Sequence, residues 1–371
     1  MECLVGKSTE ELEQLATRMD QPPLRGRQLA RWIYRRGASS FQQMTDLPKS
    51  LRAALVKDCS VRAATVIGVT RSADGATKLA LRFPDVGYAE CVSIPSGSSS
   101  MPNASSRVPG DARTTVCVST QVGCPVGCVF CASGQSGFHA NLTAGQILEQ
   151  VLIALDSSGG PIGARGGDIA QASVNVVYMG MGEPFLNYEN TLRSIRLLRE
   201  EMGIGARSIT VSTIGIPDRI RQFAGDEPQV NLAISLHAAT DELRQELIPR
   251  RCCPIRGLLQ AARDYLALTN RRVSFEYVLI RGVNDRHSDA QRLGDLLRGM
   301  LCHVNVIQYN ATDAEFRAPT RAQSAAFCEL LRRAGVNATL RRSRGGEAEA
   351  ACGQLRARLG AEEAPGAQRD A

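Results

Sequence analysis

The chain has 371 residues, of which 43% are hydrophobic and 22% charged, so it has enough apolar material for a large core and is not disordered by composition. Its 44 Lys and Arg residues outnumber 37 Asp and Glu residues, giving a formal charge of +7. That modest excess permits a nucleic-acid partner without requiring one.

The sequence carries no signal for export or membrane insertion. No stretch is long and apolar enough to span a bilayer, and the N-terminus lacks a basic region followed by an apolar run. We therefore expect a cytoplasmic protein without a membrane partner. In that reducing compartment the 12 cysteines are expected to be thiols, metal ligands or catalytic groups, not structural disulfides.

The N-terminal part of the chain predicts helices. Residues 10–57 have a helical pattern, and Arg25–Arg36 alternates basic and apolar residues at helical spacing around Trp32. A further helix restarts near Pro48, because proline is favoured in the first turn.

Strand patterns and a polar boundary follow. From Ala63 to Ile94 the sequence changes to short alternating runs that predict β-strands. Residues 96–111 are rich in Ser, Pro, Gly and Asn and predict a flexible loop. Gly159–Gly167 reads as a surface insertion, and the tail after Leu359 is expected to be disordered.

From residue 114 onward, strand and helix patterns alternate regularly. Alternating βα units predict a parallel sheet, open or curled into a barrel, whose chemistry gathers at the C-terminal ends of the strands. A helix begins at Thr143, with Gln146 completing a capping box. The predicted strands are Thr114–Ser119, Ser173–Tyr178, Ser208–Val211, Val230–Leu236, Val273–Leu279, Val304–Tyr309 and Ala338–Arg341. The predicted helices between them are Asn190–Glu200, Pro217–Phe223, Thr240–Glu246, Arg256–Leu268, Ser288–Met300 and Ala322–Ala334.

Three cysteines follow the first of these strands in a C-x3-C-x2-C run, formed by Cys124, Cys128 and Cys131. Iron–sulfur clusters usually take four cysteine ligands, and closed zinc sites also take four ligands. Three thiolates from one loop therefore indicate a cluster with one open iron, which can hold a cofactor and pass it an electron. The alternative is a zinc site, for which His139 could supply a further ligand.

A Gly-Met-Gly-Glu-Pro run at Gly180–Pro184 follows an apolar strand. Glycines at this point allow a ligand to approach the backbone closely, and a carboxylate can bind a cofactor amino group. By itself such a run is more often a tight βα turn.

In this order, the cysteine run and the Gly-Glu run resemble the radical S-adenosylmethionine (SAM) superfamily. The resemblance implies that Cys124, Cys128 and Cys131 bind a [4Fe-4S] cluster whose fourth iron is chelated by SAM. It also implies that Gly182 and Glu183 contact the SAM amino group.

The resemblance narrows at both ends of the barrel region. Ala350–Leu355 (Ala-Ala-Cys-Gly-Gln-Leu) and Thr115–Cys124 are similar to segments of the RlmN/Cfr family of RNA adenine methyltransferases. Matched motif by motif, Cys352 is the methyl-carrying cysteine, Cys117 its resolving partner, and Glu90 the proposed proton acceptor. The further SAM contacts implied by the match are Ser212, Ser235, Leu236, His237 and Asn310.

The family resemblance implies a two-cysteine reaction. Adenine C2 is not nucleophilic, so a radical route through a cofactor avoids the need for it to attack a methyl donor. Cys352 takes a methyl group from one SAM, and a second SAM yields the 5′-deoxyadenosyl radical that activates this methyl group. Cys117 then attacks Cys352 to release the product, leaving a disulfide to be reduced.

The implied substrate is 23S ribosomal RNA, and also tRNA, with a flavodoxin- or ferredoxin-type reductant and a monomeric enzyme. Pro184 favours the RlmN branch over the Cfr branch, whose members methylate C8 of adenine. Basic clusters at Arg25–Arg36, Arg250–Arg251 and Arg341–Arg344 are candidate phosphate contacts. Two rival hypotheses stay open: a non-catalytic zinc-containing RNA-binding protein, and a radical SAM enzyme for another substrate in which Cys352 is idle.

The expected fold class is α/β: a partial (β/α)6 radical SAM barrel with a small N-terminal helical and β accessory domain. We expect five segments along the chain. They are residues 1–95, an RNA-binding accessory domain; 96–113, a loop; 114–342, the barrel; 343–358, the catalytic-cysteine segment; and 359–371, a disordered tail.

Overall fold

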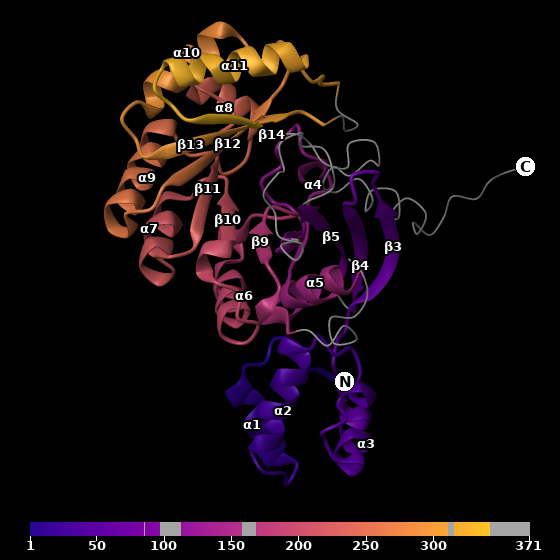
Figure 1. Ribbon diagram of the computed structural model, residues 1–371. Helices are drawn as coiled ribbons and strands as arrows, with labels where there is room; N and C mark the ends of the chain where they lie inside the picture. The colour runs from indigo at the N-terminus through magenta and orange to yellow at the C-terminus, as the bar shows by residue number, and fades with distance from the viewer. Residues whose placement is uncertain (85, 97–112, 158–167, 311–314, 342–371) are drawn as a thin grey trace, which may run out of the picture.

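The computed structural model describes residues 1–84, 86–96, 113–157, 168–310 and 315–341. A lobe of N-terminal helices stands below a curved sheet, and further helices cover one side of that sheet (Figure 1). Among the described residues, no helix has the length and apolar character needed to cross a membrane.

The N-terminal lobe is built from short helices that cross closely. Its elements are β1 (Glu2–Cys3), α1 (Thr9–Arg18), α2 (Leu24–Ala30), a π-helical turn (Arg31–Arg35), a 3₁₀ turn (Phe41–Gln43), α3 (Lys49–Asp58) and β2 (Cys59–Ser60). Ser8 caps the N-terminus of α1: its hydroxyl accepts from the Glu11 backbone amide, while the Glu11 carboxylate accepts from the Ser8 backbone amide. At Gly26 a Cβ atom would lie 2.3 Å from the Glu13 nitrogen, so only glycine allows α2 to approach α1 this closely.

The main sheet has ten strands in the order β14-β13-β12-β11-β10-β9-β6-β5-β4-β3. Neighbours from β14 to β6 pair in parallel, whereas β5, β4 and β3 pair antiparallel. Strands β3, β4 and β5 of the N-terminal region therefore continue the sheet of the barrel, which they join through the β5–β6 pair. The strands are β3 (Thr65–Arg71), β4 (Thr77–Phe83), β5 (Gly87–Ser96), β6 (Arg113–Cys117), β9 (Val174–Tyr178), β10 (Ile209–Thr213), β11 (Asn231–Ser235), β12 (Val273–Leu279), β13 (Cys302–Gln308) and β14 (Ala338–Arg341).

The parallel strands alternate between an apolar outer face and a more polar inner face. In β9, Val174, Val176 and Tyr178 are buried, whereas Asn175 and Val177 between them are only partly buried. The same alternation runs through β10, where Thr210 and Ser212 are the partly buried positions. Small polar side chains on the inner face do not fill the barrel as branched apolar residues would. The lumen is consequently left open for ligands.

Helices cover the outer face and bury its apolar residues. They are α5 (Ala144–Ser157), α6 (Tyr188–Glu200), α7 (Pro217–Asp226), α8 (Asp241–Leu247), α9 (Ile255–Thr269), α10 (His287–Leu297) and α11 (Arg321–Arg333). In Figure 1, α7, α9, α10 and α11 lie along the outer side of the strands β10 to β14. One hydrophobic cluster extends from Leu4 in the N-terminal lobe through the sheet to Ala338 in the last strand.

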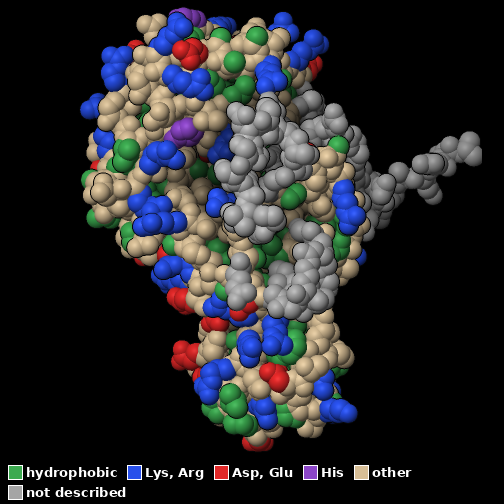
Figure 2. Space-filling view, viewed as in Figure 1, with side chains coloured by type: hydrophobic (Ala, Val, Ile, Leu, Met, Phe, Trp, Pro, Cys, Tyr) green, Lys and Arg blue, Asp and Glu red, His purple; other side chains and the backbone are tan. Residues whose placement is uncertain are grey.

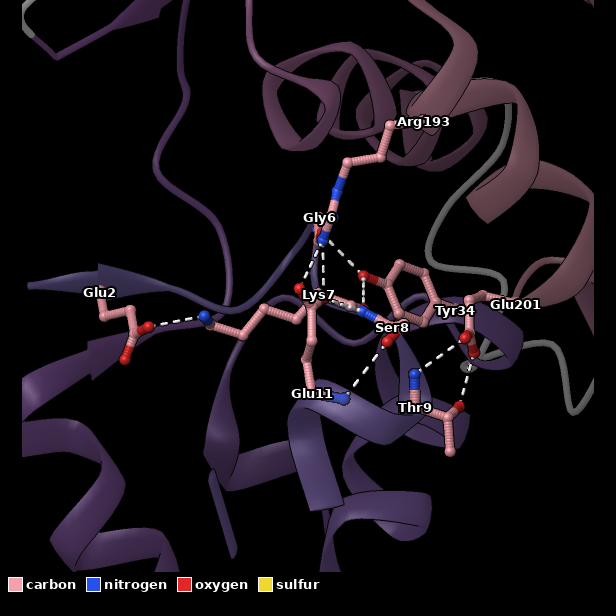
Figure 3. A network of polar contacts seen from close by, with 9 residues as sticks. All are labelled: Glu2, Gly6, Lys7, Ser8, Thr9, Glu11, Tyr34, Arg193 and Glu201. Carbon is pink, nitrogen blue, oxygen red and sulfur yellow. Dashed lines mark hydrogen bonds and ion pairs between the residues drawn. The ribbon is translucent and has the colours of Figure 1, made fainter. Parts of the chain in front are cut away.

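Polar contacts fasten the N-terminal lobe to α6 (Figure 3). The Arg193 guanidinium donates to Glu11 Oε2 at 2.7 Å and to the Gly6 carbonyl at 3.1 Å. The Thr9 amide and hydroxyl donate to the two carboxylate oxygens of Glu201 at 2.8 and 2.6 Å. Together with the shared apolar cluster, these contacts hold the start of α1 against the middle of α6 and the residue that follows it.

The structure confirms the α/β class and the partial barrel. The predicted strands Val273–Leu279 and Ala338–Arg341 have the same bounds as β12 and β14, and the capping box at Thr143 and Gln146 is present. The two-stranded sheet of β7 (Gln121–Gly123) and β8 (Phe138–Asn141), which brackets the cysteine run, was not predicted. These strands are too short for a periodic pattern to reveal them.

Candidate functional site

The cysteine run lies in a loop between β7 and a short helix, α4 (Ala132–Gln135). The Cys124 amide donates to the Gly137 carbonyl at 2.9 Å, and the Cys131 amide donates to the Cys128 carbonyl at 3.1 Å. At Gly134 a Cβ atom would lie 2.8 Å from the Cys128 nitrogen, so the loop can close this tightly only on glycine. Backbone bonds and close packing thus set where the three thiols project.

All three cysteines line one cavity of about 210 Å³ at the C-terminal ends of the strands. Among the described residues, no three His, Cys, Asp or Glu side chains converge closely enough to hold a single metal ion. The shared cavity has room for a group larger than one ion, and three thiolates are the donors that iron–sulfur clusters take. The residues present therefore fit a cluster. The other residues that line this cavity include Phe130, Gly182, Glu183, Ser212, Ser235, His237 and Glu276.

Burial controls the protonation of these thiols. Burial, and secondarily the neighbouring cysteines and Glu183, raises the pKa of Cys128 well above its usual range. Burial also raises the pKa of Cys124 to about 12. Without a bound cation the two thiols therefore keep their protons at neutral pH, and a metal group that binds them must displace those protons.

Glu183 is held at the edge of the cavity by backbone donors. Its Oε2 accepts from the Ile214 amide at 2.8 Å and its Oε1 from the Phe185 amide at 3.0 Å. Gly182 before it has φ +101°, and a Cβ there would lie 2.6 Å from Gln121 Cβ. Burial raises the pKa of Glu183 to about 7, against these hydrogen bonds. A desolvated carboxylate with spare acceptor capacity suits an amino group brought by a cofactor.

His237 presents a neutral imidazole to the same cavity. Its backbone is left-handed, with φ 59°, and its Nδ1 accepts from the Val278 amide at 3.1 Å, so the ring proton resides on Nε2. Burial, and secondarily the charge of Arg244, lowers the pKa of His237 to about 3. The Phe130 ring packs edge-on against the imidazole with centroids 4.9 Å apart. His237 can therefore donate a hydrogen bond from Nε2 without carrying a charge.

A fully buried arginine ties the strand ends together beneath this cavity. Arg244 donates to the carbonyls of Ile214, Ser235, Leu236 and Cys253 and to the Cys252 thiol, at distances from 2.5 to 3.3 Å. These acceptors belong to the end of β11, to the segments that follow β10 and β11, and to the residues just before α9. The sequence left Cys252 and Cys253 without a role, and the structure shows that both help to hold this guanidinium.

We predict that Arg244→Lys weakens SAM binding by more than about 10-fold and lowers the melting temperature. Lysine has three donors in a compact group, so buried carbonyls are left unpaired at a cost of roughly 1–3 kcal/mol each. The measurements are equilibrium dialysis with SAM and a thermal melt. Arg221→Lys, at an exposed arginine paired with Asp264, is the matched control. If Arg244→Lys binds SAM as tightly as the wild-type protein, the Arg244 hydrogen bonds are not needed to shape the cavity.

Cys117 and Glu90 lie deeper in the sheet, away from this cavity's lining. Cys117 ends β6 and stands in register with Val92 of β5 and Val177 of β9. Glu90 is 3% exposed and pairs with Lys78 of β4, which is 2% exposed, at 3.2 Å. Lys78, Val92 and Cys117 form one cross-strand row, so the ion pair and Cys117 share a face of the sheet.

The structure brings most, but not all, of the sequence-derived SAM contacts together. Gly182, Glu183, Ser212, Ser235 and His237 line the cavity with the three cysteines. Leu236 is buried, and its amide donates to the Glu276 carbonyl at 3.0 Å. Asn310 is exposed just beyond β13 and is not among the lining residues. Cys352 lies outside the described residues, and the described cysteines are free thiols.

Sequence reasoning missed the residues that hold the site from behind. Gln121 Oε1 accepts from the Glu183 amide at 2.8 Å, and Ser119 Oγ donates to the Glu90 carbonyl at 2.6 Å. Lys78 could have been noticed as a charged residue directly before the buried apolar run Leu79–Leu81 of the same strand. Nothing in the pattern around Arg244 indicates that its side chain is buried.

Comparison with known proteins identifies the family. The model for the ribosomal RNA large subunit methyltransferase N-terminal domain matches residues 3–61. The model for the radical SAM superfamily matches residues 118–293.

Relatives and a solved structure extend these matches over nearly the whole chain. A protein of Nostoc punctiforme named probable dual-specificity RNA methyltransferase RlmN is 43% identical over 95% of this chain and 93% of its own. A protein with the same name from Parasynechococcus marenigrum is 43% identical over 96% of this chain and 98% of its own length. The crystal structure of a radical SAM methyltransferase from Sphaerobacter thermophilus has TM-score 0.84 and 43% identity, covering 95% of this chain and 99% of that one. The chain therefore belongs to the RlmN family of radical SAM RNA methyltransferases.

Proposed function

We propose that this protein methylates C2 of an adenosine in 23S ribosomal RNA, and also in tRNA, through a methylated Cys352. The observation that carries the proposal is the shared cavity of Cys124, Cys128, Cys131 and Glu183 in a chain of this family. The dual-specificity name of the relatives supports two kinds of RNA substrate.

The cavity residues have separate tasks in binding. Cys124, Cys128 and Cys131 hold the [4Fe-4S] cluster, and when bound the cluster and SAM supply an electron and an organic radical. Glu183 accepts hydrogen bonds from the SAM amino group, and Gly182 keeps space for it. His237 donates from Nε2 to an acceptor in the cavity and adds no charge.

A second group of residues acts on the methyl group and on the adenine carbon that receives it. Cys352 would accept the methyl group of a first SAM, and a second SAM would supply the radical chemistry that activates it, so each turnover would take two. Cys117 releases the product by attacking the Cys352 sulfur. Glu90 accepts the proton lost from C2 of the adenine. The buried Lys78 ammonium holds the Glu90 carboxylate on the face of the sheet that also carries Cys117. Ser212 and Ser235 complete the SAM contacts in the cavity. Leu236, whose amide and carbonyl bind Glu276 and Arg244, would act by positioning its neighbours, and Asn310, which lies outside this lining, is proposed as a further contact.

We also propose a task for each segment of the chain and a source of electrons. We assign RNA binding to residues 1–95, the radical chemistry to 114–342 and the methyl-carrying cysteine to 343–358, with 96–113 as a connecting loop and 359–371 as a tail. A flavodoxin- or ferredoxin-type protein is the proposed reductant, and the enzyme is proposed to act as a monomer in the cytoplasm.

Nucleoside mass spectrometry tests this function directly. RNA from cells lacking the gene should lack 2-methyladenosine at one site in 23S ribosomal RNA and in a set of tRNAs, and the plasmid-borne gene should restore it. Appearance of 8-methyladenosine instead would assign the protein to the Cfr-like alternative. Unchanged nucleosides in both RNA classes would refute the proposal.

A further inference from the structure

A second, larger cavity opens at the opposite end of the barrel. It has a volume of about 1060 Å³ and is lined by residues at the N-terminal ends of β10, β11 and β12 and along β13 and β14. Five arginines line it, Arg113, Arg207, Arg271, Arg272 and Arg341, and Glu276 is its only acidic residue among the described lining. Figure 2 shows many Lys and Arg side chains on the visible face of the molecule. A cavity with this charge favours a polyanion.

The two cavities border the same side chains inside the barrel. Met179, Glu276 and Ile307 line both the small cavity with the cysteines and the large basic cavity. These three side chains come from β12, β13 and the end of β9, and they form the neck between the cavities. A ligand bound at the inner end of the large cavity would therefore lie against Glu276, next to the cavity of the cysteines.

Glu276 is held at the neck by a chain of hydrogen bonds. Its Oε1 accepts from the Asn305 amide nitrogen at 2.8 Å, and the Arg341 Nε donates to the Asn305 amide oxygen at 2.9 Å. Because Arg341 takes the amide oxygen, the Asn305 side chain can offer only its NH₂ group to Glu276. The second oxygen of Glu276 has no hydrogen-bond partner within the described part of the chain, although the residue is only 7% exposed.

We propose that the basic cavity takes the target nucleotide of the RNA, with its base at the neck and its exocyclic amino group donating to Glu276. The proposal rests on the RNA methyltransferase function proposed above and assigns it a binding site and a residue that reads the base. Volumes of about 300–1,000 Å³ accommodate ligands of this size. Arginines suit the phosphates of an RNA strand because each can bind two phosphate oxygens.

The polarity of the neck selects one purine over the other. An ionised carboxylate only accepts hydrogen bonds, so it pairs with the amino group at C6 of adenine and opposes the oxygen at C6 of guanine. Burial raises the pKa of Glu276, while the Asn305 amide and the Arg341 charge act against that shift. These two contacts offset only part of that rise, and it is the fixed position of the carboxylate, with Oε1 held by Asn305, that presents an acceptor to the adenine amino group.

Base substitution in a defined RNA tests the assignment. The probes are a stem-loop RNA with adenosine, inosine or unsubstituted purine riboside at the target position. Both the dissociation constant, from fluorescence anisotropy without SAM cleavage, and the methylation rate are measured. With the wild-type protein, loss of the amino group should weaken binding and turnover by about 10-fold to 100-fold, as for a hydrogen bond to a charged group.

Glu276→Gln separates recognition from a structural role. The Asn305 NH₂ group forces the Gln oxygen toward itself, so the Gln NH₂ group faces the neck and opposes an adenine amino group. We expect this variant to bind purine riboside at least as well as adenosine and to prefer inosine to adenosine. Glu200→Gln, at an exposed carboxylate on α6, is the control and should keep the wild-type order.

The outcomes distinguish this inference from the proposed function. A wild-type protein that methylates RNA but treats adenosine and purine riboside alike would refute the Glu276 assignment alone. Equal losses on all three probes in Glu276→Gln would also refute it and indicate a contact to SAM or a packing role. A wild-type protein that neither binds nor methylates any probe would refute both. Arg207→Ala and Arg272→Ala should each reduce the salt dependence of binding by about one phosphate contact, whereas Arg333→Ala on α11 should not.

Discussion

Replacing any one of Cys124, Cys128 or Cys131 by Ala should remove the iron–sulfur cluster and reduce methylation by more than about 100-fold. Each thiol lines the same cavity, so its loss leaves a cluster with only two protein ligands. Even the loss of an outer-shell partner commonly costs 10-fold to 100-fold in metal affinity or activity. The measurements are iron and sulfide content of protein purified without oxygen, and RNA methylation by the same samples.

A buried cysteine elsewhere in the fold provides the matched control. Cys328 lies on α11 and is 1% exposed, so Cys328→Ala removes a similar buried thiol far along the chain from the cysteine loop. It should keep iron, sulfide and activity near the wild-type values with a small loss of stability, on the order of 1 kcal/mol. Stoichiometric zinc with no brown chromophore in the wild-type protein would instead support the non-catalytic hypothesis.

Cys352→Ala and Cys117→Ala should block the reaction at different points. Without Cys352 there is no acceptor for the methyl group, so product and covalent intermediate should both be absent. Without Cys117 the RNA should still become attached to Cys352 but should not be released, because no thiol attacks the sulfur. A denaturing gel of labelled RNA after reaction would show a shifted protein–RNA band only for Cys117→Ala.

Cys91 offers a close control for this pair. It lies on β5 beside Glu90, but its thiol faces α5 and contacts the Gln150 carbonyl at 3.7 Å. Cys91→Ala should turn over without a trapped adduct. If Cys117→Ala continues to turn over, Cys117 is not the resolving cysteine. If Cys352→Ala keeps full activity, the hypothesis in which Cys352 is idle is favoured.

Local sequence was sufficient to predict most elements of the fold. The period-two patterns of Val273–Leu279 and Ala338–Arg341 predicted β12 and β14 residue for residue, because alternation along a half-buried strand is a local signal. The cysteine run predicted one shared site for the same reason, since ligands a few residues apart in a loop remain close in any fold. The bounds of the helices were less certain, as at α10, which ends at Leu297 and not at Met300.

Only the tertiary structure decided which distant residues support the chemistry. Lys78 meets Glu90 because β4 pairs with β5, Arg244 reaches five acceptors because the ends of β10 and β11 converge on α8, and Glu276 meets Asn305 because β12 lies beside β13. Residues this far apart in sequence become neighbours through strand register and helix packing, which no local pattern records. The sequence by itself determined the alternation of elements and the cysteine ligands; the pairing of the strands determined the open polar lumen and the buried charges that face it.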